Sequence, residues 1–163
     1  KVSFEVMLGS ADAADKMLKD IGKFAETTPF SFDDIRDGTK KLIAFGVPAD
    51  QVIDTMQMLG DTAQGDAQKL ETIVDVFGKM TAQGKLQGEE LNRLTDAGFN
   101  PLMQMSKRTG VSMGTLMKQL EGGQISAAMV KDEFIRATSE GGKFHGMMDK
   151  QSQTLNGLMS TLQ

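Results

Sequence analysis

The chain has 163 residues, no cysteine and a net charge of −4, with 18 basic against 22 acidic residues. This length suits one domain, and the lack of cysteine excludes disulfides, thiol catalysis and cysteine-ligated metal sites. The acidic balance disfavours nucleic acid as the main partner, and the sequence contains neither a signal peptide nor an apolar run long enough to span a membrane.

The first segment predicts a β-strand. Val2, Phe4 and Val6 alternate with polar residues, which is the period of a half-buried strand. A single strand needs a partner for its backbone groups. We therefore expect it to pair with an extended link such as residues 85–87, or with another chain.

The rest of the chain predicts short amphipathic helices separated by glycine. Apolar residues recur at spacings of three and four, a capping residue precedes most helical stretches, and glycine follows them. The expected helices run from Ser10 to about Ala25, Ser31 to Gly46, Pro48 to Gly60, Asp66 to about Gln83, Gly88 to Gly98, Asn100 to Thr109, Ser112 to Leu120 and Ser126 to about Ser139. The fold class is therefore mainly α, a compact array of about seven to nine short glycine-punctuated helices with one short N-terminal β-strand.

The C-terminal segment predicts a longer helix. Its apolar seam has no stop signal before the last residue and is formed by Met148, Ser152, Leu155, Met159 and Leu162. The chain also begins with Lys1 and not with methionine. We expect residues 1–143 to form the compact helical domain, and residues 144–163 to form a helix leading toward the rest of a longer protein.

Residue types that carry out catalysis are sparse. His145 is the single histidine, and its sequence neighbours favour a structural or surface role over a catalytic one. The acidic pairs Asp33-Asp34, Glu89-Glu90 and Asp132-Glu133 are interpreted as charges near helix starts, where the helix dipole favours them. No glycine cluster matches a phosphate-binding fingerprint. We therefore predict no catalytic, cofactor-binding or metal-binding residues, and no cofactor.

Residues 102–122 have the layout of a helix-turn-helix DNA reader. This interpretation is kept as an alternative, but the would-be recognition helix presents Met113, Gly114, Thr115 and Met117. These residues are not the arginine, asparagine and glutamine side chains that read base edges. The abundant methionines instead suit adaptable contacts between helices.

Several groups of residues, taken in order, carry a family resemblance. They are Phe4-Glu5-Val6, Leu8-Gly9-Ser10, Phe24-Ala25, Thr28-Pro29-Phe30, Leu42-Ile43-Ala44-Phe45-Gly46, Leu59-Gly60-Asp61-Thr62-Ala63, Phe77-Gly78, Gly84-Lys85-Leu86, Leu91, Ala97-Gly98, Pro101, Gly141-Gly142-Lys143-Phe144, Met148, Gln151-Ser152, Thr154-Leu155 and Gly157. From end to end, the chain resembles the tape measure domain of tail tape measure proteins from long-tailed phages and prophages. It departs from the family pattern at Arg93, where glutamine is expected, and at Gly146, where a bulkier residue is expected.

The resemblance implies a non-enzymatic structural protein of the virion tail, present in the bacterial cytoplasm during assembly. Such a protein sets tail length, acts as a template for the tail tube protein and is coated by tail assembly chaperones. Self-association is left open, with no specific nucleic acid and no membrane as partner. A cell-wall hydrolase accessory domain is the weaker enzymatic alternative. Because glycine stops divide the helices, we expect a folded module attached to the length-setting part.

Overall fold

Helices form nearly all the regular structure of residues 2–150, the part of the chain that the computed structural model describes. In chain order they are α1 (Val2–Leu8), α2 (Ala11–Glu26), α3 (Phe32–Phe45), α4 (Val52–Thr62), α5 (Ala67–Gln83), α6 (Gly88–Asp96), α7 (Pro101–Thr109), α8 (Met113–Glu121) and α9 (Ala127–Thr138). The prediction of a mainly α array of short helices is confirmed. None of the described helices combines the length and the apolar character needed to cross a bilayer.

The N-terminal segment is a helix, so the predicted strand is wrong. In α1 Phe4 is fully buried, whereas Val6 is 78% exposed. Phe4 and Leu8 are four residues apart, which places both on one face of a helix, and Leu8 packs against the edge of the core. Contacts of α1 with α2 and α3 decide the outcome, because they use the helical spacing and not the alternation.

Local capping signals place most helix starts where the sequence predicted them. Ser31 and Asp34 exchange hydrogen bonds at the start of α3 and form the predicted capping box. Asn100 caps α7 by accepting from the N–H of Met103 at 3.0 Å. The helices α2, α5, α8 and α9 are capped in the same way by Ser10, Asp66, Ser112 and Ser126.

Glycine ends some of the helices but not all of them. Gly46 and Gly84 end α3 and α5 with φ values of 115° and 79°, a region that favours glycine. Gly60 lies inside α4, which continues to Thr62, so the predicted stop there is wrong. Its missing side chain makes room for a neighbour, because a Cβ at Gly60 would lie 2.5 Å from the Sδ of Met148.

The turn before α4 is longer than predicted. Pro48 was expected in the first turn of the helix, but its carbonyl accepts the N–H of Gln51 at 3.0 Å in a turn that precedes α4. Val47 is buried, and its N–H donates to the carbonyl of Leu42 at 3.0 Å. This bond ties the turn to the end of α3, so α4 begins at Val52.

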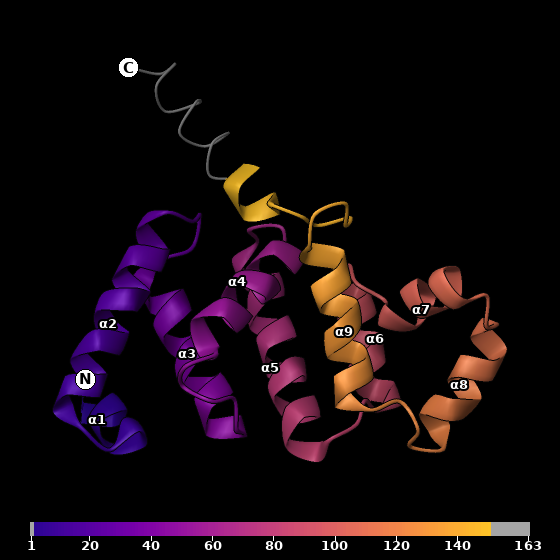
Figure 1. The fold of residues 1–163 in the computed structure, drawn as a ribbon, viewed down its shortest axis with the longest axis horizontal. Coiled ribbons are helices and arrows are strands. Elements are labelled where there is room, and N and C mark those ends of the chain that lie inside the picture. The colour runs from indigo at the N-terminus through magenta and orange to yellow at the C-terminus, as the bar shows by residue number, and fades with distance from the viewer. Residues whose placement is uncertain (1, 151–163) are drawn as a thin grey trace.

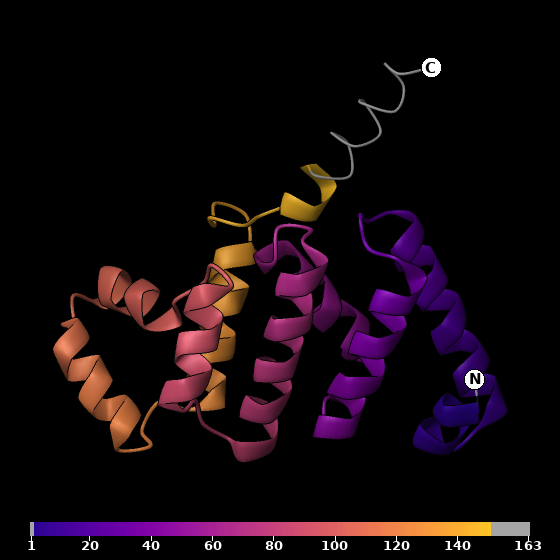
Figure 2. The same ribbon diagram turned by 180° about the vertical axis from the view of Figure 1, so that it is seen from behind.

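The helices lie in a row along the longest axis of the molecule (Figure 1). One end of the row is α1 and α2, the middle contains α3 and α5, and the other end is α7 and α8; the view from behind shows the same order (Figure 2). Out of chain order, α4 contacts α9 as well as α3 and α5, and α9 also contacts α7. The first and second halves of the chain therefore meet at α4 and α9.

A group of phenylalanine rings fills the core around α9. The ring centre of Phe134 on α9 lies 5.6 Å from that of Phe77 on α5 and 4.7 Å from that of Phe99. Phe99 also lies 6.0 Å from Phe144, which follows α9. All four rings are buried, and burial of each one contributes roughly 2 kcal/mol.

The link between α5 and α6 pairs with the link between α8 and α9. Lys85 and Ser126 form an isolated antiparallel bridge. The N–H of Leu86 donates to the carbonyl of Ile125 at 2.9 Å, and Leu86 and Ile125 are both fully buried. The link after α5 thus finds its backbone partner in the link before α9, and not in the N-terminal segment.

The segment after α9 returns to the core. Phe144 and Met148 are each 2% exposed, and a helical turn begins at Met147. The remaining seam positions, Ser152, Leu155, Met159 and Leu162, lie outside the described residues. The division into residues 1–143 and 144–163 therefore stays a prediction.

Candidate functional site

A cleft of about 560 Å³ lies between α4, α9 and the segment that follows α9. Its charged and polar side chains come from these three parts of the chain, and Met58 and Ile135 supply apolar surface. The ionisable residues that line it are Asp54, Asp61, Lys131, His145 and Asp149. The cleft therefore brings together titratable groups that are widely separated in the sequence.

Asp61 is the most deeply buried acid of this cleft. It is 5% exposed, and its Oδ1 accepts the N–H of Met148 at 3.0 Å. Burial raises the pKa of Asp61 and nearby Asp149 raises it further, while the hydrogen bond from Met148 and the charge of His145 act in the opposite direction. Asp61 could not be singled out from the sequence, because it has no acidic or basic neighbour at helical spacing.

His145 lies on the surface at the edge of the cleft. Its Nδ1 is 3.1 Å from the carbonyl oxygen of Thr138, so the ring is held against the end of α9. Within residues 2–150 no group of three or more histidine, cysteine, aspartate or glutamate side chains could hold a metal ion. The prediction that His145 is structural, and that the chain has no catalytic, metal or cofactor residues, stays a prediction.

Two of the three acidic pairs lie at helix starts, as interpreted from the sequence. Asp34 accepts the N–H of Ser31 at 3.1 Å at the start of α3. Glu90 accepts the N–H of Gln87 at 3.2 Å at the start of α6. Burial raises the pKa of Glu90, although that hydrogen bond opposes the shift. Both acids satisfy backbone donors that the helix itself leaves unpaired.

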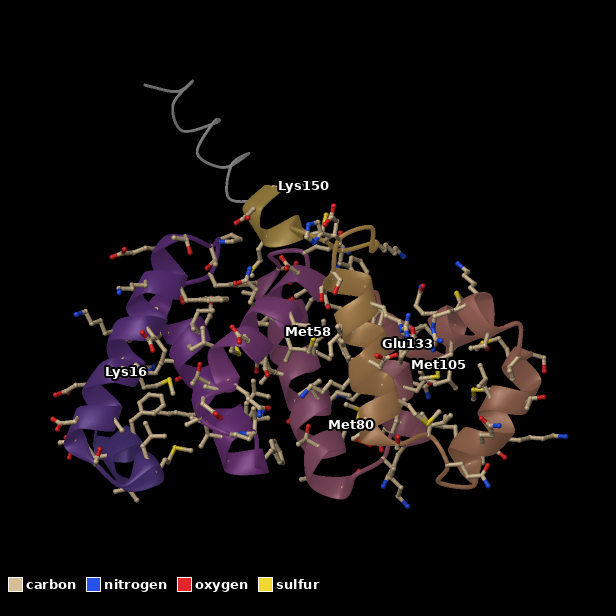
Figure 3. All side chains as sticks on the ribbon, viewed as in Figure 1. Lys16, Met58, Met80, Met105, Glu133 and Lys150 are labelled. Atoms are coloured by element: carbon tan, nitrogen blue, oxygen red, sulfur yellow. The ribbon has the colours of Figure 1, made fainter. Side chains whose placement is uncertain are left out.

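The third pair lies in the middle of α9, so its interpretation as a helix-start charge is wrong. Glu133 is 2% exposed and its Oε1 accepts from Nε and Nη2 of Arg108 on α7, at 3.0 and 2.5 Å. Asp132 pairs with Arg136 one turn later at 2.7 Å. Figure 3 shows Glu133 beside Met105 where α9 faces α7. Glu133 therefore joins two helices.

Asp75 of α5 is surrounded by three cations. Its carboxylate lies 3.0 Å from Lys41 of α3, 3.2 Å from Lys79 of α5 and 2.6 Å from Arg93 of α6. Burial alone would raise its pKa, but the hydrogen bonds from Arg93, Lys41 and Lys79 outweigh burial and lower it to about 2. Only the Asp75–Lys79 spacing was visible in the sequence. Arg93, where the family pattern led us to expect glutamine, supplies the link to α6.

The helix pair α7–α8 has the order of a helix-turn-helix but not its chemistry. Arg108 is paired with Glu133 and is not free to contact phosphate. Exposed apolar surface comes from Met103, Val111 and Met117. Sequence-specific readers use polar side chains at such positions. Nothing in this geometry favours the DNA-binding alternative for residues 102–122.

Comparison with known proteins identifies the family. The sequence profile described as "Tape measure protein" matches residues 1–163. The chain belongs to the tape measure protein family. Tape measure proteins are components of phage tails, and the family is structural. The resemblance found in the sequence is thereby confirmed.

Among curated proteins, the chain is similar to a prophage protein and to two proteins named as probable tape measure proteins. It is 29% identical over 157 residues to the Mu-like prophage FluMu protein gp42 of Haemophilus influenzae, covering 93% of this chain and 24% of that protein. It is 26% identical over 152 residues to the probable tape measure proteins of Lactococcus phages p2 and SK1, covering 91% of this chain and 14% of each. The chain thus spans a quarter or less of the length of these relatives. No solved structure matches it.

Proposed function

We propose that this chain is a folded, non-catalytic module of a phage or prophage tail tape measure protein, acting in tail assembly and tail length determination. The family match over the whole chain is the observation that supports this proposal. The relatives named as probable tape measure proteins support it as well. No observation favours the cell-wall hydrolase alternative.

The geometry of the helices supports a folded module that is attached to the length-setting part of the protein and is not that part itself. A continuous helix of 163 residues would span about 245 Å at a rise of roughly 1.5 Å per residue. Here α5, with 17 residues, spans about 26 Å. Because α4 and α9 bring the two halves of the chain together, extra copies of this module add little length.

A duplication experiment tests the module hypothesis. In a phage whose tape measure protein contains this chain, one variant carries two tandem copies and a control carries an uninterrupted helical insert of the same length. Tail lengths are measured by electron microscopy. The control lengthens tails by up to about 245 Å, and the duplication lengthens them by much less. Equal lengthening by both inserts would contradict the proposal.

We also propose the tail tube protein and the tail assembly chaperones as partners, in the host cytoplasm during assembly and then in the virion tail. The family context supports partners of this kind. Purification of this tagged chain from cells that express the whole tail operon tests the proposal. A tube protein or chaperone in the eluate supports it. Recovery of neither partner, when the same tag on the full-length tape measure protein recovers both, would count against it.

A further inference from the structure

The helical turn that begins at Met147 lacks a capping side chain of its own. The carbonyl of Gly146 accepts the N–H of Lys150 at 3.1 Å, so Gly146 occupies the N-cap position and Met148 is the second residue inside the helix. An N-cap side chain normally accepts from the second or third helical N–H, but glycine has no side chain to do so. The N–H of Met148 therefore needs an acceptor from elsewhere.

Asp61 of α4 supplies that acceptor from 87 positions earlier in the chain, at 3.0 Å in a buried environment. The neighbouring Gly60 receives the side chain of the same Met148, since a Cβ at Gly60 would lie 2.5 Å from its Sδ. Adjacent residues of α4 thus bind both the backbone and the side chain of Met148. Phe144, packed against Phe99, holds the preceding turn in the core.

We infer that Gly60 and Asp61 form a docking socket for the helical turn of residues 147–150 and hold that turn in a fixed orientation against α4. Figure 3 labels Lys150 at the edge of the described residues, above α4. The socket is independent of the proposed tape measure role.

Hydrogen exchange at the Met148 amide, followed by NMR on the 163-residue chain, tests the socket. Asp61→Ala removes the acceptor, and Asp54→Ala, on the exposed side of the same helix and lining the same cleft, is the matched control. Loss of one buried hydrogen bond is expected to speed exchange at Met148 by about tenfold or more relative to Val76 of α5. Asp54→Ala is expected to leave that ratio unchanged.

The inference is overturned if Asp61→Ala and Asp54→Ala give the same ratio, or if Met148 and Val76 accelerate equally. Should Asp61→Ala fail to fold, Asp61→Asn keeps an acceptor oxygen of the same shape and is expected to retain most of the protection. Gly60→Ala displaces the Met148 side chain and leaves Asp61 intact, so it is expected to reduce protection at Met148. Unchanged protection in Gly60→Ala would also count against the socket.

A distance measurement tests the orientation of this turn. The sequence contains no cysteine, so Glu26→Cys and Lys150→Cys allow spin labels to be placed at these positions alone. A narrow distance distribution is expected in the labelled parent and in the Asp54→Ala background. A broader one is expected with Asp61→Ala. Equal widths in all three proteins would show that the socket does not orient the turn of residues 147–150.

Discussion

The middle of the helix row is packed more fully than its α7–α8 end. In the middle, Leu42 of α3, Met56 of α4 and Ile73 of α5 have no exposed surface. At the end, α8 buries Leu116 and Leu120, and α7 is its main described contact. The same capped, glycine-ended helices therefore give a dense core in one region and an attached helix pair in the other.

The two regions also use charge differently. Asp75, in the middle, keeps 13% of its side-chain surface exposed and has three cationic partners. Glu133, which holds α7 against α9, is 2% exposed and pairs with Arg108. If one cation at Asp75 is removed, two cations still pair with the carboxylate. If Arg108 is removed, the buried Glu133 carboxylate loses its cationic partner. The attachment of α7 to α9 should therefore be more sensitive to loss of Arg108 than the middle is to loss of any one cation at Asp75.

The largest effect is expected from Arg108→Met. It leaves the Glu133 carboxylate buried without its cation, and we expect a loss of about 3 kcal/mol in the free energy of unfolding, measured with urea. Arg136→Gln, which breaks the exposed pair with Asp132, is the control and should cost less than about 1 kcal/mol. The double variant Arg108→Met with Glu133→Met should recover most of the loss. If Arg108→Met lowers the free energy of unfolding by no more than Arg136→Gln does, the two regions do not differ in the way proposed.

A smaller effect is expected from Gly78→Ala in α5. A Cβ there would lie 2.3 Å from the ring of Phe45, so α3 and α5 would have to move apart or the ring would have to leave its site. After the gain in helix propensity, we expect a net loss of about 1 kcal/mol in urea unfolding. An increase in stability would mean that the middle is less tightly packed than the geometry indicates.

The contribution of Asp75 to the free energy of unfolding should depend on pH, with an effect no larger than that of Gly78→Ala. Because its pKa is lowered to about 2, its stabilising contribution is present above its ordinary value of 3.8 and is lost as the pH falls toward 2. We expect about 1 kcal/mol after screening by solvent. The stability difference between the parent and Asp75→Asn should therefore shrink between pH 5 and pH 2. A difference that stays constant over this range would contradict the assignment.

The smallest effect, opposite in sign to Gly78→Ala, is expected from Gly114→Ala in α8. The nearest atom to a Cβ at Gly114 is the Oγ of Ser112 at 3.9 Å, so the new methyl group meets no obstacle. The higher helix propensity of alanine should stabilise the chain by roughly 0.5 kcal/mol, measured by the urea midpoint. Destabilisation would indicate that α8 is packed like the middle.

Most helix boundaries could be predicted because the signals that set them are local. Asp34 and Ser31 exchange hydrogen bonds within one turn, and Asn100 caps α7 by accepting from an N–H three residues away. The cleft could not be predicted, since Asp61 and Met148 meet only after the chain has folded. The role of Arg108 was equally hidden, because its partner Glu133 is 25 positions away.

The sequence by itself determined the helical class, the positions of most caps and the family, because propensity, capping and glycine stops act within a few residues. Tertiary structure decided the rest. Contacts with α2 and α3 make residues 2–8 a helix, and Gly60 lies inside α4, where its missing side chain leaves room for Met148. Glu133 was interpreted as a helix-start charge, but in the fold it is buried and forms an ion pair that links α9 to α7. In each case the deciding contact is made with another element of the fold, so no pattern within the segment itself could reveal it.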